Sequence, residues 1–319
     1  MLKKTSRIFV FFTIFTLSHS LLAYGGINSR TSEASPKKYR LQYKTRKGEV
    51  LQYMSVMESI LAMDRGEQIF ETTTKQDFAF SLEAEEPGDL LGFVLTIDNI
   101  RTTSEGGRGN WNPDMSNYKG KRIHVKVTSL GEQKEITAID SLPVPEGRGG
   151  NRRGGRERGG GGRRWNRAAQ FGVRFFYLPD KEVGVGDSWT ETKKDTLRPG
   201  ASGGRGGFGM NQIEERTTKY TVVDEKKKKG MKCLYIKAES TYSREGSGTM
   251  GDNEMSSESE GESTAEVWFA PEEGILVEYI ITDFSEGSTA FSGGDRGGTM
   301  ASINESKRTL KLIKWKKKK

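Results

Sequence analysis

The chain has 319 residues and a formal net charge of +8, with one cysteine and two histidines. A single cysteine excludes an intramolecular disulfide, and so few histidines and cysteines exclude the usual zinc sites. Because His19 lies in the leading apolar segment, His124 is the one histidine left for a Ser-His-Asp triad. No phosphate-binding loop motif, G-x-x-x-x-G-K-[ST], occurs. We therefore expect a protein that is not an enzyme and uses no metal or cofactor, although its many carboxylates leave a two-carboxylate glycosidase open.

The N-terminus carries the three parts of a secretory signal. Three cations precede an apolar run that ends near a small-residue cleavage motif: Lys3, Lys4, Arg7, residues 8–17 and Ala23-Tyr24-Gly25. The run is shorter than the roughly 20 residues that a spanning helix needs. We expect residues 1–25 to be a cleaved signal peptide and residues 26–37 a disordered linker. The mature protein is then exported, to the periplasm or the extracellular space, without a transmembrane segment; a retained N-terminal anchor is the alternative.

Residues 38–145 are predicted to form a first antiparallel β unit. Apolar side chains recur at every second position in several runs: 38–43, 68–84, 93–103 and 121–139. This period of two is that of a half-buried strand, and the short turns between the runs predict long hairpins. The run 49–63 differs, because it is rich in methionine and apolar on both faces.

Residues 146–164 consist mostly of glycine and arginine and predict a disordered linker. Its arginines are the groups that such a segment offers to a polyanion: Arg148, Arg152, Arg153, Arg156, Arg158, Arg163 and Arg164. Arginine-rich flexible segments also bind nucleic acid. Export and a position between strands argue against RNA, so we expect no nucleic-acid partner. Contact with an anionic polymer stays as the alternative to a plain loop.

Residues 165–315 are predicted to hold a short helix and a second antiparallel β unit. The helix is expected over residues 165–179, where apolar side chains at helical spacing end at Pro179. Alternating runs follow, including a hairpin that turns at Pro271–Gly274, and residues 316–319 form a basic tail. No long helical crossover separates the strands, so the sheets should be antiparallel. The predicted fold is all-β, mainly antiparallel with long curved hairpins, one short helix and two β-rich halves.

The stretch "LPDKEVGVGDSW" is more specific than its surroundings. Five of its residues form a structural signature: Pro179, Gly184, Gly186, Asp187 and Trp189. We expect the glycines to permit a tight turn, the aspartate to accept backbone N–H groups, and the tryptophan to anchor the next strand. With the upstream "YKGKRIHVKVTSLGE", the stretch resembles an uncharacterised family of exported bacterial β-rich proteins. That resemblance implies export and a β-rich architecture, and it implies no activity.

The predicted long curved strands are also loosely similar to the half-barrels of periplasmic lipoprotein carriers, which hold acyl chains. The methionine-rich run 49–63 fits this similarity, because methionine suits adaptable apolar pockets. We therefore predict a non-catalytic exported protein that binds an apolar or amphiphilic ligand of the cell envelope on a curved sheet. Lipid, glycan or a surface polymer is the expected partner. The alternative is binding of anionic polymers through the arginine-glycine loops.

Overall fold

The computed structural model describes residues 37–64, 66, 68–85, 88–107, 109–143, 175–197, 211–250, 253–292 and 297–316. All of them belong to one compact unit, Pro36–Lys319. The expected signal peptide, nearly all of the 26–37 linker and the whole 146–164 linker lie outside the described residues.

An antiparallel sheet of eleven strands makes up most of the described chain, in the order β6-β5-β4-β3-β2-β13-β12-β11-β10-β9-β8. Its first five strands along the chain are β2 (Val50–Asp64), β3 (Ile69–Ala84), β4 (Leu91–Gly106), β5 (Arg122–Val127) and β6 (Gln133–Ala138). The others are β8 (Ser188–Leu197), β9 (Asn211–Lys228), β10 (Met231–Met250), β11 (Asn253–Ala270), β12 (Ile275–Ser292) and β13 (Gly298–Lys316). A second sheet pairs β1 (Tyr39–Arg40) with β7 (Glu182–Val183). The predicted all-β, antiparallel fold is confirmed.

The strands of the two expected halves are hydrogen-bonded to each other. β13, the last strand, pairs antiparallel with β2 over most of its length, from Ala301↔Asp64 to Lys316↔Val50. This pairing joins the strands before and after the glycine-arginine segment into one sheet. The described helical element is a short 3-10 turn, Ser116–Tyr118. Most of the helix expected over 165–179 lies outside the described residues, and its described end, 175–179, is not helical.

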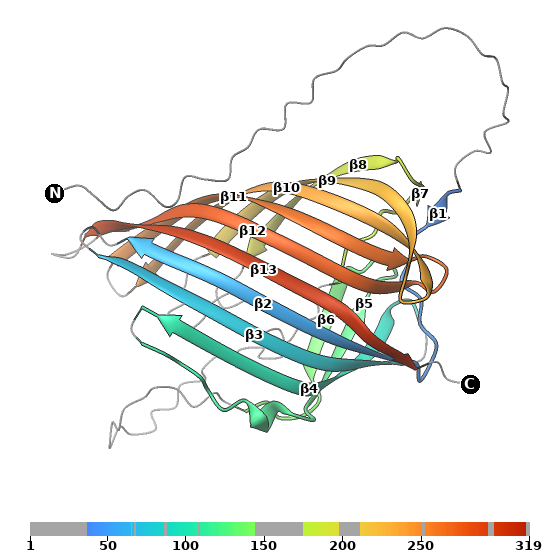
Figure 1. Cartoon of the computed structure of the whole chain (residues 1–319). Helices are drawn as coiled ribbons and strands as arrows, with labels where there is room; N and C mark the ends of the chain where they lie inside the picture. Colours follow the sequence, from blue (N-terminus) through green and yellow to red (C-terminus); the bar gives the residue numbers. More distant parts are fainter. Residues whose placement is uncertain are drawn as a thin grey trace, which may run out of the picture. The chain divides into compact units, whose positions relative to one another are not determined.

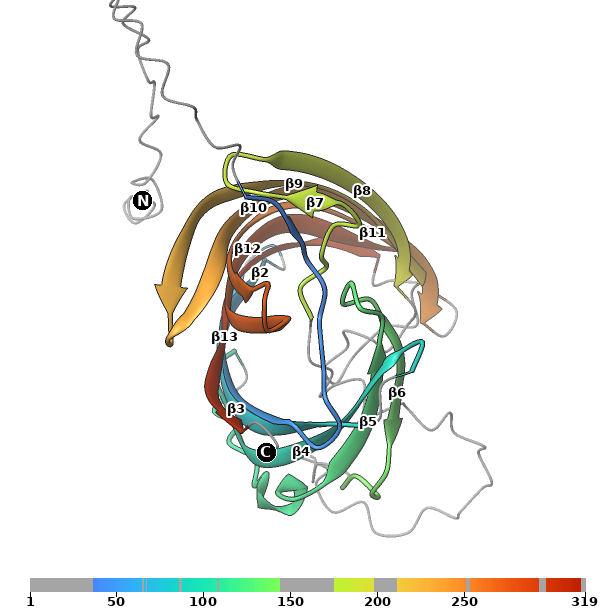
Figure 2. The same cartoon turned by 90° about the vertical axis from the view of Figure 1, so that its right-hand side faces the viewer.

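The large sheet is strongly curved, as the two views show (Figure 1 and Figure 2). Two segments run across its concave side in Figure 2: the chain from β1 to β2, and the chain leading to β7. We call residues 37–45 the N-terminal strap. In this strap, the side chain of Tyr43 makes edge-on ring contacts with Phe175 and with Phe269 of β11, each with ring centroids 5.3 Å apart. The concave face is therefore packed against chain that lies outside the sheet.

We call the face that carries Phe269 the inner face. Phe176 contacts Tyr220 of β9 and Tyr279 of β12, with ring centroids 5.8 and 5.9 Å apart. The largest fully buried side chains include Phe80, Phe93, Phe269 and Leu41. The core therefore lies between the inner face and the two crossing segments, at the end of the sheet where β2 begins and β13 ends.

Candidate functional site

The inner face changes character along the strands. Side chains alternate between the two faces of a sheet, and directly paired residues of antiparallel strands share a face. Tyr220 and Tyr279 fix the inner face in β9 and β12, because both contact Phe176. The pairing registers then extend this assignment to every neighbouring strand.

A row of nine polar side chains, seven hydroxyls and two carboxylates, crosses nine strands of the inner face. The directly paired residues, from β8 to β4, are Glu191, Thr218, Ser240, Ser263, Asp283, Ser306, Ser59, Thr74 and Ser104. We call them the hydroxyl row. The hydroxyls of Thr218 and Ser240 lie 2.8 Å apart, and Thr74 donates to Ser104 at 3.4 Å. On β9 and β10 the row marks where the apolar core ends and polar inner side chains begin.

Beyond the hydroxyl row, β9 and β10 carry a charged cluster. Glu214 accepts hydrogen bonds from Arg216 at 2.9 Å and from Arg244. The guanidinium carbons of Arg216 and Arg244 lie 4.2 and 4.6 Å from the ring centre of Tyr242, and Arg216 also donates to Ser263 at 3.1 Å. Burial raises the pKa of Glu214, but the hydrogen bonds from the two arginines outweigh it and hold the pKa below its usual value. The cluster therefore carries one net positive charge.

Beyond the hydroxyl row, β2 and β3 carry apolar inner side chains among polar ones such as Thr72, and the far ends of β11, β12 and β13 carry others. These partly or fully buried apolar side chains form what we call the methionine-rich zone: Leu61, Met63, Phe70, Met255, Phe291 and Met300. The inner face thus carries the apolar side chains of the methionine-rich zone and, on β9 and β10, the charged cluster. Small side chains such as Gly261 and Ser285 lie between them.

The inner face of β8 holds two buried polar atoms without hydrogen-bond partners. They are Nε1 of Trp189 and Oε2 of Glu191, two residues apart on the same strand. Trp189 stacks on Tyr220, with ring centroids 4.9 Å apart. Burial raises the pKa of Glu191. The Lys193 ammonium, 3.9 Å from the carboxylate, offsets only part of this rise. Glu191 and Glu214 are thus inner-face carboxylates of adjacent strands, four residues apart in register, with opposite pKa shifts.

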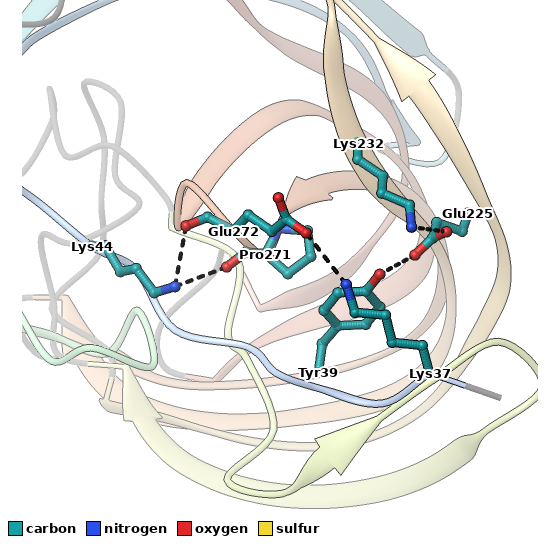
Figure 3. A network of polar contacts seen from close by, with 7 residues as sticks. All are labelled: Lys37, Tyr39, Lys44, Glu225, Lys232, Pro271 and Glu272. Carbon is teal, nitrogen blue, oxygen red and sulfur yellow. Dashed lines mark hydrogen bonds and ion pairs between the residues drawn. The ribbon is translucent and has the colours of Figure 1, made fainter. Parts of the chain in front are cut away.

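Polar contacts tie the N-terminal strap to the sheet (Figure 3). Lys44 donates to the backbone oxygens of Pro271 and Glu272 at 3.1 and 3.2 Å, and Lys37 pairs with the Glu272 carboxylate at 3.3 Å. Tyr39 donates to Glu225, whose carboxylate also pairs with a lysine of β10. The strap is therefore held at both ends, by the turn between β11 and β12 and by the β9–β10 hairpin.

The structural signature of the "LPDKEVGVGDSW" stretch lies at the entry to β8. Asp187 accepts from the N–H of Gly184 at 2.8 Å, and its own N–H bonds the Gly184 oxygen at 3.1 Å. Gly186 has a φ of +93°, which favours glycine, and Pro179 and Trp189 are buried. The seven arginines proposed as a polyanion site, Arg148, Arg152, Arg153, Arg156, Arg158, Arg163 and Arg164, lie outside the described residues.

The two groups most often tied to chemistry in such a chain have ordinary surroundings. Cys233 is buried, and burial raises the pKa of its thiol to about 11. His124 lies 2.7 Å from a carboxylate oxygen of Glu85. Within the described ranges, no group of three or more histidine, cysteine, aspartate or glutamate side chains is placed to hold a metal ion. No helix in this described part is long and apolar enough to span a membrane.

The hydroxyl row and the charged cluster are not evident from the sequence, because the row crosses nine strands and the cluster depends on the register of β9 with β10. Of the β8 pair, Trp189 belongs to the predicted signature, whereas Glu191, two residues later, was not predicted. One weak signal is present: Ser240, Tyr242 and Arg244 follow Ile236 and Ala238 on the same face, so the inner side chains of β10 change from apolar to polar within one strand.

No family model matches the chain, and no match was found among curated proteins. Among solved structures, lipovitellin with its lipid–protein interactions aligns with a TM-score of 0.37 and 11% identity, covering 86% of this chain. This chain spans 26% of the lipovitellin chain. Pseudomonas aeruginosa OccK5 (OpdH) aligns with a TM-score of 0.25 and 7% identity, over 83% of this chain and 98% of its own. Pseudomonas aeruginosa OccK2 (OpdF) gives 0.23 and 7%, over 84% and 100%. These likenesses are too weak to carry an argument about function.

Proposed function

We propose that the protein is an exported, non-catalytic binding protein that holds an amphiphilic ligand of the cell envelope on the inner face of its curved sheet. The observation that carries the proposal is the division of that face between the methionine-rich zone and the charged cluster. An apolar tail and a polar head need these two surfaces side by side. The resemblance of the "VGVGDSW" stretch to an exported family supports the location.

The apolar side of the site suits a flexible tail. Met63 pairs directly with Phe70, and Met255 pairs with Phe291, so each methionine has an aromatic cross-strand neighbour. Methionine is unbranched and polarizable, and it adapts to chains of varying shape. Burying a methylene group stabilises a complex by about 0.8 kcal/mol, so a tail covering this zone supplies most of the affinity.

The polar side of the site suits a head group that accepts hydrogen bonds. Arg216 and Arg244 share Glu214, and the surplus positive charge is available to a ligand oxygen. From β10 to β2 there are four strand steps, or roughly 19 Å along the sheet at about 4.8 Å each. A ligand lying across the strands therefore spans both surfaces over the small side chains of β11 and β12.

The test is the affinity for a fluorescent dansyl-labelled fatty acid, measured by titration. Leu61 on the inner face and Ile60 on the outer face are consecutive residues, and Ile60 is 40% exposed. We expect Leu61→Asp to weaken binding about tenfold or more and Ile60→Asp to leave it unchanged, because only the first places a charge under the tail. Arg244→Gln should weaken binding severalfold through the head group.

Circular dichroism and thermal unfolding verify that each variant is folded. Met63→Gln serves as a second inner-face variant if Leu61→Asp does not fold. The proposal is wrong if the wild-type protein does not bind the probe. It is equally wrong if the inner-face and outer-face variants lose affinity to the same extent.

A further inference from the structure

A small pocket lies away from the amphiphile site, where the N-terminal strap meets the ends of the strands. Its volume is about 270 Å³, enough for several water molecules or one small ligand. Thr45 and Glu49 line it from the chain that enters β2, Glu273 from the turn between β11 and β12, and Trp315 from the end of β13. Three separate parts of the chain therefore build one site.

Two of the lining charges are already used to hold the strap. Lys44 donates to backbone oxygens of the β11–β12 turn, and the carboxylate of Glu272 pairs with Lys37 (Figure 3). Gly274, which ends the turn, has a φ of +71°, and a Cβ there would come within 2.5 Å of the Lys44 backbone. The strap thus closes tightly on the turn, and neither Lys44 nor Glu272 is spare for a ligand.

The oxygens that face the pocket lack donors. Oγ1 of Thr45 and Oε2 of Glu273 are each buried and have no hydrogen-bond partner. Glu49 is only 8% exposed and accepts the backbone N–H of Arg46 at 3.2 Å through one oxygen. A buried acceptor without a donor is costly, and a buried carboxylate oxygen most of all. Arg46 also lines the pocket, but its side chain is exposed and neither the Thr45 nor the Glu273 oxygen accepts from it. Both oxygens are therefore left for N–H donors that a ligand brings.

A depression of mixed polarity, with Lys229 and Lys314 among its lining residues, adjoins the pocket. This second depression, of about 430 Å³, shares Glu273 and Trp315 with the first, and Met231, Leu312 and Ile313 are also among its lining residues. The indole ring of a tryptophan attracts a cation on its face, and the aliphatic side chains accept a short hydrocarbon chain. The two depressions together fit a cationic head followed by an alkyl stem.

We propose that this strand-end pocket binds the ammonium group of a primary alkylamine, with Glu273 and Thr45 as hydrogen-bond acceptors and Trp315 against the alkyl carbons. An alkylamine has a pKa near that of lysine, about 10.4, so it is charged at neutral pH. The ammonium group supplies three donors, enough for Thr45, Glu273 and Glu49 together. This proposal does not depend on the amphiphile site.

The experiment is isothermal titration calorimetry of the full mature chain with n-butylamine, and with n-butanol as the uncharged probe of the same shape. We expect butylamine to bind and butanol not to bind. Glu273→Gln should weaken butylamine binding about tenfold or more, because a charge-assisted hydrogen bond is lost. Glu286→Gln, at an exposed position of β12 outside the pocket lining, is the control for a lost carboxylate and should change the affinity less than twofold. Glu272→Gln removes the carboxylate that pairs with Lys37 and reports the effect of a loosened strap.

A stability measurement accompanies the titration. Thr45→Val keeps the side-chain shape and removes the buried hydroxyl that has no partner, so it should raise the melting temperature without amine and weaken amine binding. Absence of butylamine binding overturns the proposal, and so does equal binding of butanol. Equal loss of affinity in Glu273→Gln and Glu272→Gln would show that strap closure, and not ammonium recognition, is what the pocket provides.

Discussion

The two ends of the inner face belong to the same strands but differ in what covers them. At the core end, the strap and residues 175–178 lie on the sheet, and side chains such as Leu41, Phe80 and Leu178 are almost completely buried. Beyond the hydroxyl row, Met63 and Phe70 are only partly buried. Burial of the inner face is therefore most complete where another segment crosses it, although Tyr242 and Met255 beyond the row are buried too.

The sequence of a single strand records this difference. In β10, Ile236 and Ala238 on the inner face are buried in the core, and the following inner residues are Ser240, Tyr242 and Arg244. The strand continues with the same hydrogen-bond ladder through both regions. Strand formation and core formation are thus separable in this protein, because long-range pairing sets the first and the crossing segments set the second.

The largest expected effect contrasts the two ends directly. Phe80→Ala should destabilise the protein by about 3–5 kcal/mol, because Phe80 is 1% exposed and stacks between Tyr53 and Phe78. Met63→Ala should cost about 1 kcal/mol, because the methionine is only partly buried. Urea unfolding followed by tryptophan fluorescence measures both values.

A similar loss for both substitutions would contradict the comparison, since it would place the methionine-rich zone inside the same core. Ile60→Ala on the outer face of β2 is the control, and it should change stability by less than about 0.5 kcal/mol.

A smaller effect is expected where the polar part of the inner face is tightest. Gly261 of β11 lies under the ring of Tyr242, and a Cβ there would approach Phe284 O and the ring carbon Cζ to 2.5 Å. Gly261→Ala should therefore destabilise the protein by about 1–3 kcal/mol through overpacking. Gly298 of β13 has no atom within 4 Å of a Cβ, so Gly298→Ala is the matched control with little or no loss. Equal stability of the two variants would mean that Tyr242 moves freely.

How far the sequence predicts this molecule follows from the same contrast. The strands, their antiparallel pairing and the hairpin at Pro271–Gly274 are predicted by alternation and turn residues, which are local signals. The pairing of β13 with β2 joins residues more than two hundred positions apart, and no local pattern specifies it. The sequence does not predict the strap either. Residues 38–43 have the alternation of a strand, although only Tyr39 and Arg40 are paired in a sheet.

The candidate sites could be predicted less well than the fold. The methionine-rich character of 49–63 is visible in the sequence, but its division into inner Met57, Leu61 and Met63 and outer Met54 and Ile60 requires the register. The acceptors of the strand-end pocket are brought together only by closure of the strap. The arginine-glycine segment draws attention by composition, and its role in binding polyanions stays a prediction.

The smallest expected effect separates the two inner-face glutamates by the pH dependence of stability. The pKa of Glu214 is held below its usual value, although burial raises it, because two arginines donate to the carboxylate. Its stabilising contribution is therefore present above the unfolded pKa of about 4.3 and is lost as the pH falls through the folded pKa. The pKa of Glu191 is raised by burial, so its contribution is present below about pH 4.3 and is lost as the pH rises through the folded pKa.

Glu214→Gln should lower stability at pH 7 by on the order of 1 kcal/mol and reduce the loss on acidification, whereas Glu191→Gln should leave stability at pH 7 unchanged or slightly higher. Urea unfolding from pH 3 to pH 7 measures both, with Glu215→Gln on the outer face of β9 as the control. If the two inner variants have the same pH profile, the arginines do not distinguish the carboxylates. The charged cluster would then be no more organised than the surface around it, and the polar head of an amphiphile would have no preferred place on the sheet.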